Sequence, residues 1–170
     1  MSGSVLLLLR SVRHDASGFR RILPLIFLAA TALLFPSRSF AQGKGEKLKW
    51  GPAPAVFAPG AKLAVVSGDP SATGPYVVQL AMPGNYRIAP HYHPTDEHVK
   101  VVHGTFLVGM GDTVNLSKTK RLAVGDTITA TAGTHHFGET KGRTTVEVSG
   151  MGPFQLTYVN PADMPKAAKP

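Results

Sequence analysis

One stretch, residues 84–104, constrains this chain more than any other. It reads G-N-Y-R-I-A-P-H-Y-H-P-T-D-E-H-V-K-V-V-H-G. Successive side chains of an extended chain point to opposite faces, so His91, His93 and Glu97 would share one face. Two imidazoles and a carboxylate supply one side of the coordination shell of a divalent transition metal. The stretch therefore predicts a metal site that leaves positions for a further ligand and for solvent.

A further ligand is available downstream. Residues 125–136 read G-D-T-I-T-A-T-A-G-T-H-H, which offers both His135 and His136. Six of the seven histidines lie between positions 91 and 136, and the remaining one is His14. The sequence has no cysteine, which excludes a thiolate zinc site, a disulfide framework and a cysteine nucleophile.

At these residues the chain resembles the cupin superfamily. The first cupin motif is G-(x)5-H-x-H-(x)3,4-E-(x)6-G. The matching residues are Gly84, His91, His93, Glu97 and Gly104, with one extra residue between the first glycine and the first histidine. The second motif is G-(x)5-P-x-G-(x)2-H-(x)3-N, matched by Gly125, Gly133 and His136. Thr131 replaces its proline and Thr140 its asparagine, and the whole resemblance covers residues 48–161.

The resemblance implies a ligand set and a partner. It implies that His91, His93, Glu97 and His136 hold one divalent transition-metal ion per chain: Fe, Mn, Ni, Cu or Zn. His136 is preferred over His135 because G-x-x-H is the spacing of the family. Cupin barrels commonly pair through edge strands or an N-terminal arm, so a homodimer is implied as well.

The rest of the chain favours an all-β fold. Strands are expected at residues 61–67, 76–82, 97–103, 105–110, 127–131, 144–149 and 154–159. Short strands separated by glycine and proline are typical of a sandwich or barrel, and no helical periodicity appears after residue 41. Together with the resemblance, this pattern predicts the cupin double-stranded β-helix, a jelly-roll barrel.

Residues 1–41 are typical of a signal peptide. Arg20 and Arg21 precede an apolar run of 14 residues, 22–35, and small residues at a cleavage position end at Ala41. The run is shorter than the roughly 20 residues that cross a bilayer, although an uncleaved membrane anchor stays open. We expect a periplasmic or secreted protein that is free of the membrane after cleavage.

The mature chain is expected to have three parts: residues 42–59 as linker and N-terminal arm, 60–162 as the cupin domain and 163–170 as a flexible tail. In the arm, Trp50 and Phe57 are expected to pack over the mouth or edge of the barrel. Without residues 1–41, 13 Lys and Arg remain against 9 Asp and Glu, a net charge of +4. No basic cluster is interleaved with aromatic residues, so a nucleic-acid partner is not expected.

Two further residues are candidates for catalysis. Tyr86 lies just before the ligand stretch and could reach over the mouth of the barrel. Glu147 alternates with Val146 and Val148. If it points inward it is a candidate general base or a support for a metal ligand, and if it points outward it is a surface charge.

These observations predict an exported metal-binding cupin with a small-molecule site in the barrel. The intact ligand set favours a metalloenzyme of the dioxygenase or lyase/isomerase type. The alternative is a non-catalytic cupin that binds or senses a small molecule, because one fold serves many chemistries.

Overall fold

The computed structural model describes residues 47–166. The expected signal peptide, the first residues of the linker and the end of the tail lie outside this part of the chain. Within it, no helix has the length and apolar character needed to cross a membrane.

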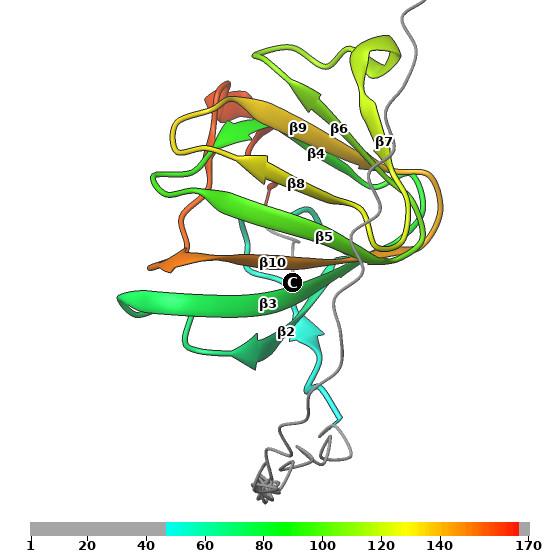
Figure 1. Cartoon of the computed structure of the whole chain (residues 1–170). Helices are drawn as coiled ribbons and strands as arrows, with labels where there is room; N and C mark the ends of the chain where they lie inside the picture. Colours follow the sequence, from blue (N-terminus) through cyan, green and yellow to red (C-terminus); the bar gives the residue numbers. More distant parts are fainter. Residues whose placement is uncertain (1–46, 167–170) are drawn as a thin grey trace, which may run out of the picture. The chain divides into compact units, whose positions relative to one another are not determined.

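Two antiparallel sheets form the domain, and they face each other in Figure 1. The six-stranded sheet has the order β1-β2-β3-β10-β5-β8, with β1 at Gly51–Pro52, β2 at Lys62–Ser67, β3 at Gly74–Met82, β10 at Thr144–Gly152, β5 at Glu97–His103 and β8 at Thr127–Ala130. The five-stranded sheet has the order β11-β4-β9-β6-β7, with β11 at Thr157–Tyr158, β4 at Arg87–Tyr92, β9 at His136–Thr140, β6 at Phe106–Met110 and β7 at Lys120–Leu122. Two 3-10 turns, η1 at Leu116–Lys118 and η2 at Pro161–Asp163, are the only helical segments among residues 47–166. The predicted all-β, double-sheet architecture is confirmed.

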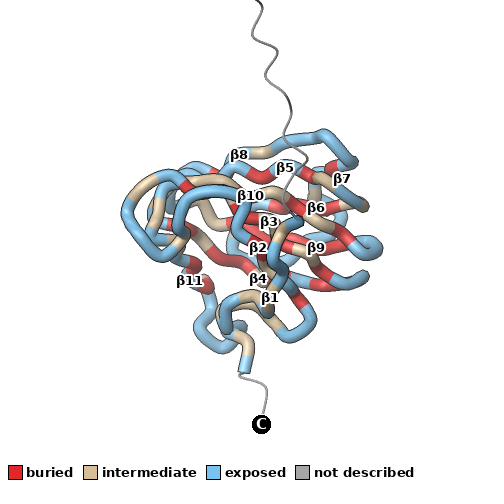
Figure 2. The backbone as a smooth tube through the Cα atoms, turned by 90° about the horizontal axis from the view of Figure 1, so that it is seen from below, coloured by how far each residue is buried: buried red, intermediate tan, exposed pale blue. Residues whose placement is uncertain are grey.

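The core lies between the two sheets and follows the two-residue period of a strand. In β10, Val146 and Val148 are buried while Glu147 between them is partly exposed, and β3 alternates in the same way. Phe106 and Val108 approach from the five-stranded sheet and belong to the same apolar cluster. In Figure 2 the buried segments accordingly lie along strands of both sheets.

Strand β9 was not predicted, although it carries a candidate ligand. All five of its residues are buried, so its sequence H-F-G-E-T lacks the alternation that marks a half-exposed strand. β9 lies between β4 and β6, and the ring of Phe137 fills the space above Gly109 on the neighbouring strand. Burial on both faces explains why the pattern failed here.

The N-terminal arm is fixed by two buried tyrosines. Tyr86 Oη donates a hydrogen bond of 2.6 Å to the carbonyl oxygen of Ala58, and Tyr158 Oη donates one of 2.6 Å to that of Val56. Phe57 stacks on Phe154, with 6.1 Å between the ring centroids. The expected packing of the arm holds for Phe57 but is wrong for Trp50, which is 42% exposed.

Gly138 on β9 tests the packing inside the barrel. A Cβ atom at this position would lie 2.3 Å from Cζ of Phe106, so the ring would have to move. We expect Gly138→Ala to lower the free energy of unfolding by about 1–3 kcal/mol, measured by urea denaturation. The control is Gly142→Ala, since a Cβ atom there has nothing within 4 Å. Equal stability of the two variants would contradict this packing.

Candidate metal centre

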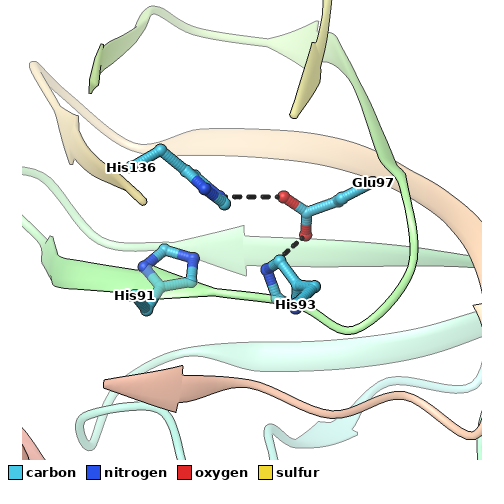
Figure 3. A group of neighbouring side chains, drawn as sticks. All are labelled: His91, His93, Glu97 and His136. Atoms are coloured by element: carbon cyan, nitrogen blue, oxygen red, sulfur yellow. Dashed lines mark ion pairs between the residues drawn. The ribbon is translucent and has the colours of Figure 1, made fainter. Parts of the chain in front are cut away.

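Four side chains from three strands and a turn converge at one end of the barrel (Figure 3). His91 lies on β4, His93 directly follows that strand, Glu97 begins β5 and His136 begins β9. One potential ligand atom from each lies within 4.8 Å of all the others. The three histidines are buried, and the side chain of Glu97 is 12% exposed. The four residues singled out by the sequence are therefore brought together.

The chain reaches this arrangement by a turn rather than by one continuous strand. β4 ends at Tyr92 and β5 begins at Glu97, so His91 and Glu97 belong to different sheets. The expectation of a single extended face through positions 91–97 is therefore wrong, because the residues between the strands fold back. Within the stretch 91–99, side chains alternate between the two faces as expected only in β5, where Glu97 and Val99 both line the interior cavity.

Two hydrogen bonds tie this turn to the loop that precedes His136. The amide of Gly133 donates to the carbonyl oxygen of His93 at 2.9 Å. The amide of Ala132 donates to Oδ1 of Asp96 at 2.8 Å. One backbone–backbone bond and one bond to a side chain thus hold the segments of the two sequence motifs against each other.

Each imidazole ring is oriented by a main-chain carbonyl. Nδ1 of His91 lies 2.8 Å from the oxygen of Ala89, Nδ1 of His93 lies 2.6 Å from that of Gln155, and Nδ1 of His136 lies 2.9 Å from that of Thr134. A carbonyl can only accept, so each Nδ1 must carry the proton. In a neutral ring this leaves the lone pair on Nε2, the arrangement typical of a metal-binding histidine.

The Nε2 atoms point at Glu97 without bonding it well. The Nε2 atoms of His93 and His136 lie 3.4 Å and 3.3 Å from the two carboxylate oxygens. Among the described residues, both nitrogens are buried and have no hydrogen-bond partner. Buried polar atoms without a partner are costly in a folded protein. A divalent cation would satisfy these nitrogens and the carboxylate together, so the residues fit a metal ion.

The electrostatics of the cluster fit the same reading. Burial, with a smaller contribution from His136, lowers the pKa of His91 to about 3, so this ring is neutral at physiological pH. Burial alone would raise the pKa of Glu97, but the neighbouring imidazoles of His136 and His93 outweigh it and lower that pKa. Burial opposes protonation of His136, yet the Glu97 carboxylate outweighs it and raises the pKa of His136. Glu97 is therefore ionised, and a cation bound here would compete with a proton for Nε2 of His136.

The structure explains the glycines of the two motifs and accommodates the two threonines that replace motif residues. Gly104, Gly125 and Gly133 all have positive φ angles, which glycine adopts without strain. Thr140, in place of asparagine, is fully buried and bridges a turn: its Oγ1 accepts from the amide of Tyr86 at 2.8 Å and donates to Pro83 O at 2.7 Å. Thr131, in place of proline, has its hydroxyl oxygen 2.7 Å from that of Thr134 and so helps to close the turn before His136.

The other candidates lie away from the cluster. Glu147 pairs with Gln79 on β3, and its neighbours Val146 and Val148 line the interior, so Glu147 is on the outer face of the sheet. Of the two directions left open by the sequence, Glu147 takes the outward one and does not line the cavity.

Tyr86 and His135 are also outside the cluster. The Tyr86 hydroxyl binds the arm, and burial raises its pKa to about 12, so it is a neutral structural donor and not the residue over the mouth that we expected. The ring of His135 stacks on that of Tyr92 with centroids 5.1 Å apart, and its Nδ1 lies 2.6 Å from Oδ1 of Asp112. Like Tyr86, His135 does not line the interior cavity.

A cavity of about 550 Å³ opens between the sheets beside the cluster. His91, Glu97 and His136 form part of its wall. Phe154 closes the side next to His93, with ring centroids 5.6 Å apart. The three carbonyl groups could not be predicted from the sequence, because main-chain partners leave no mark in residue type. Nothing in the sequence singled out Phe154 as a neighbour of His93.

Comparisons with known proteins bear on the fold. No family model matches the chain, and no curated protein matches its sequence. Among solved structures, an RmlC-like cupin from Shewanella frigidimarina NCIMB 400 is 18% identical with a TM-score of 0.50, covering 63% of this chain and 86% of the other. The polyketide cyclase RemF from Streptomyces resistomycificus is 16% identical with a TM-score of 0.59, covering 70% and 84%.

A third similar structure is a suggested acetylacetone dioxygenase from Methylibium petroleiphilum PM1. It is 22% identical with a TM-score of 0.53, covering 71% of this chain and 81% of the other. At these identities the likeness concerns the fold and not the reaction. Two facing antiparallel sheets and the likeness to solved cupins lead to one conclusion: the chain has the cupin jelly-roll fold.

Proposed function

We propose that this protein is a metal-dependent cupin that acts on a small molecule held in the barrel. His91, His93, Glu97 and His136 would bind one divalent transition-metal ion. The observation that carries the proposal is the orientation of the rings: each Nδ1 is held by a carbonyl, and the buried Nε2 atoms of His93 and His136 lack a partner among the described residues.

The chemistry follows from the ligand set. Bound there, a divalent Fe, Mn, Ni, Cu or Zn ion would polarise an oxygen atom of the substrate or hold it beside dioxygen. The protein's own contribution is to orient three imidazoles and one carboxylate, and to surround the substrate with a mainly apolar cavity.

The lining of the cavity favours an oxygen-using reaction over a lyase or isomerase reaction. Beyond the candidate ligands, no described residue of the lining has an ionisable side chain. Reactions that move a proton through a separate general acid or base would have no such group to use. A dioxygenase needs only the substrate, dioxygen and the metal site. The alternative, a non-catalytic cupin that binds or senses a small molecule, requires the same cavity.

Among the similar structures, one is named a polyketide cyclase and another a suggested dioxygenase, so this fold accommodates small organic substrates elsewhere. We propose, in addition, that the mature protein is exported to the periplasm or secreted and that it forms a homodimer. Sequencing of the N-terminus of exported protein and its mass in solution check these two points.

Separate substitutions of the adjacent histidines His135 and His136 test which of the two is a metal ligand. We expect His136→Ala to weaken zinc binding by at least about a hundredfold, since even residues that only support a ligand contribute tenfold to a hundredfold. The control, His135→Ala, should bind zinc as the unchanged protein does because its ring lies outside the cluster. Competition with a chromophoric chelator measures both affinities, and circular dichroism checks folding. Equal effects of the two substitutions would refute the ligand assignment.

Oxygen uptake separates the enzyme from the binding protein. We expect the iron-loaded protein to consume oxygen with at least one member of a panel of catechols, flavonols, thiols and diketones. Glu97→Gln should reduce the rate by at least about a hundredfold because it removes the charged ligand, as measured with an oxygen electrode. Glu147→Gln, on the outer face of the sheet, is the matched control and should leave the rate unchanged. Binding of panel compounds without oxygen uptake would favour the non-catalytic alternative.

A further inference from the structure

The wall of the cavity identifies the class of molecule that it accepts. The deep part of the wall is apolar on both sides. Val78, Leu80 and Val146 line it from the six-stranded sheet, and Ile88, Phe106 and Val108 line it from the five-stranded sheet. All six residues are at most 8% exposed. A ligand in contact with this wall exchanges water for hydrocarbon.

The mouth of the cavity is uncharged as well. The exposed residues that line the cavity include Pro54, Ser71, Gln155 and Thr157, which are polar or apolar but neutral. No Lys, Arg or Asp of the described chain lines any part of the cavity. The net positive charge of the protein therefore lies outside this site, and an anionic substrate would meet no cationic side chain in it.

A charged group on the body of a ligand would consequently be buried without a partner, which is strongly unfavourable. The exception is the end of the cavity that carries His91, Glu97 and His136. A divalent ion with three neutral imidazoles and one carboxylate has a net charge of +1. This end would therefore accept one singly ionised, oxygen-chelating head group.

We propose that the ligand is an otherwise uncharged, mainly apolar small molecule with one oxygen-chelating head group, such as an enol or a phenol. The apolar body lies between the two sheets, and the head group lies beside Glu97. The proposal of a chelating head group rests on the proposed function. The proposal of an apolar body depends only on the apolar residues that line the cavity. Sugars, phosphate esters and polycarboxylates are excluded as substrates because their polar groups would find too few partners.

A series of symmetrical diketones tests the apolar body. Acetylacetone, dipropionylmethane and dibutyrylmethane share one chelating head and gain one methylene group at each end per step. We expect the affinity for the zinc-loaded protein to rise up to about tenfold per step, measured by isothermal titration calorimetry. An analogue as long as dibutyrylmethane, with carboxylates in place of its two terminal methyl groups, should bind at least about tenfold more weakly. Equal affinities along the series, or stronger binding of the dicarboxylate, would overturn the proposal.

A pair of substitutions tests whether the apolar body of the ligand lies in the cavity. Val78 lines the cavity, whereas its neighbour Val77 lies opposite Ser149 on the outer face of the same strand. We expect Val78→Phe to weaken binding of dibutyrylmethane more than that of acetylacetone, because the ring takes up room that only the longer ligand needs. Val77→Phe should change neither affinity. If Val77→Phe has the larger effect, the ligand does not lie between the sheets; if Val78→Phe fails to fold, the diketone series on the unchanged protein decides.

The metal-free protein separates this proposal from the proposed function. The neutral dye N-phenylnaphthylamine should bind to it with increased fluorescence, and dibutyrylmethane should displace the dye better than its dicarboxylate analogue does. Dye binding together with a failure to bind zinc would sink the metal proposal and support the apolar cavity. Zinc binding without dye binding and without gains along the diketone series would overturn the apolar cavity alone.

Discussion

Three hydrogen bonds between imidazole nitrogens and main-chain carbonyls determine what this site can do. Because the oxygens of Ala89, Thr134 and Gln155 can only accept, each ring must keep its proton on Nδ1. The opposite nitrogens are then free to bind a cation beside Glu97. Without these bonds the rings could rotate and use Nε2 as a donor to the carboxylate, and the cluster would be an ordinary buried ion pair.

The fold supports these bonds from several directions. The carbonyl that orients His93 belongs to Gln155, in the segment leading to β11. The preceding residue, Phe154, packs against the ring of His93. Phe154 in turn stacks on Phe57 of the N-terminal arm, and two tyrosine hydroxyls hold that arm in place. The arm, the segment that leads to β11 and the turn that carries His93 therefore form one packed unit. This packing explains why segments far from the histidines in sequence bear on their geometry.

The sequence predicted which residues form the cluster better than how the chain brings them together. Glu97 and the closely spaced histidines were recognisable because metal ligands are restricted to a few residue types. The all-β class followed from short strands between glycines and prolines. β9 was missed because burial on both faces removes the alternation, and the turn between His93 and Glu97 was missed because parity assumes an extended chain. The directions of Tyr86 and Glu147 depend on strand register, which residue type alone does not specify.

Elemental analysis of the mature protein tests the central claim most directly. The protein would be purified from its natural compartment without chelators and without a histidine tag, and its metal content would be measured by mass spectrometry. The orientation of the three rings predicts about one first-row transition-metal ion per chain. A protein that contains no such ion, and that takes up none when iron, manganese, nickel, copper or zinc is added, would contradict the account.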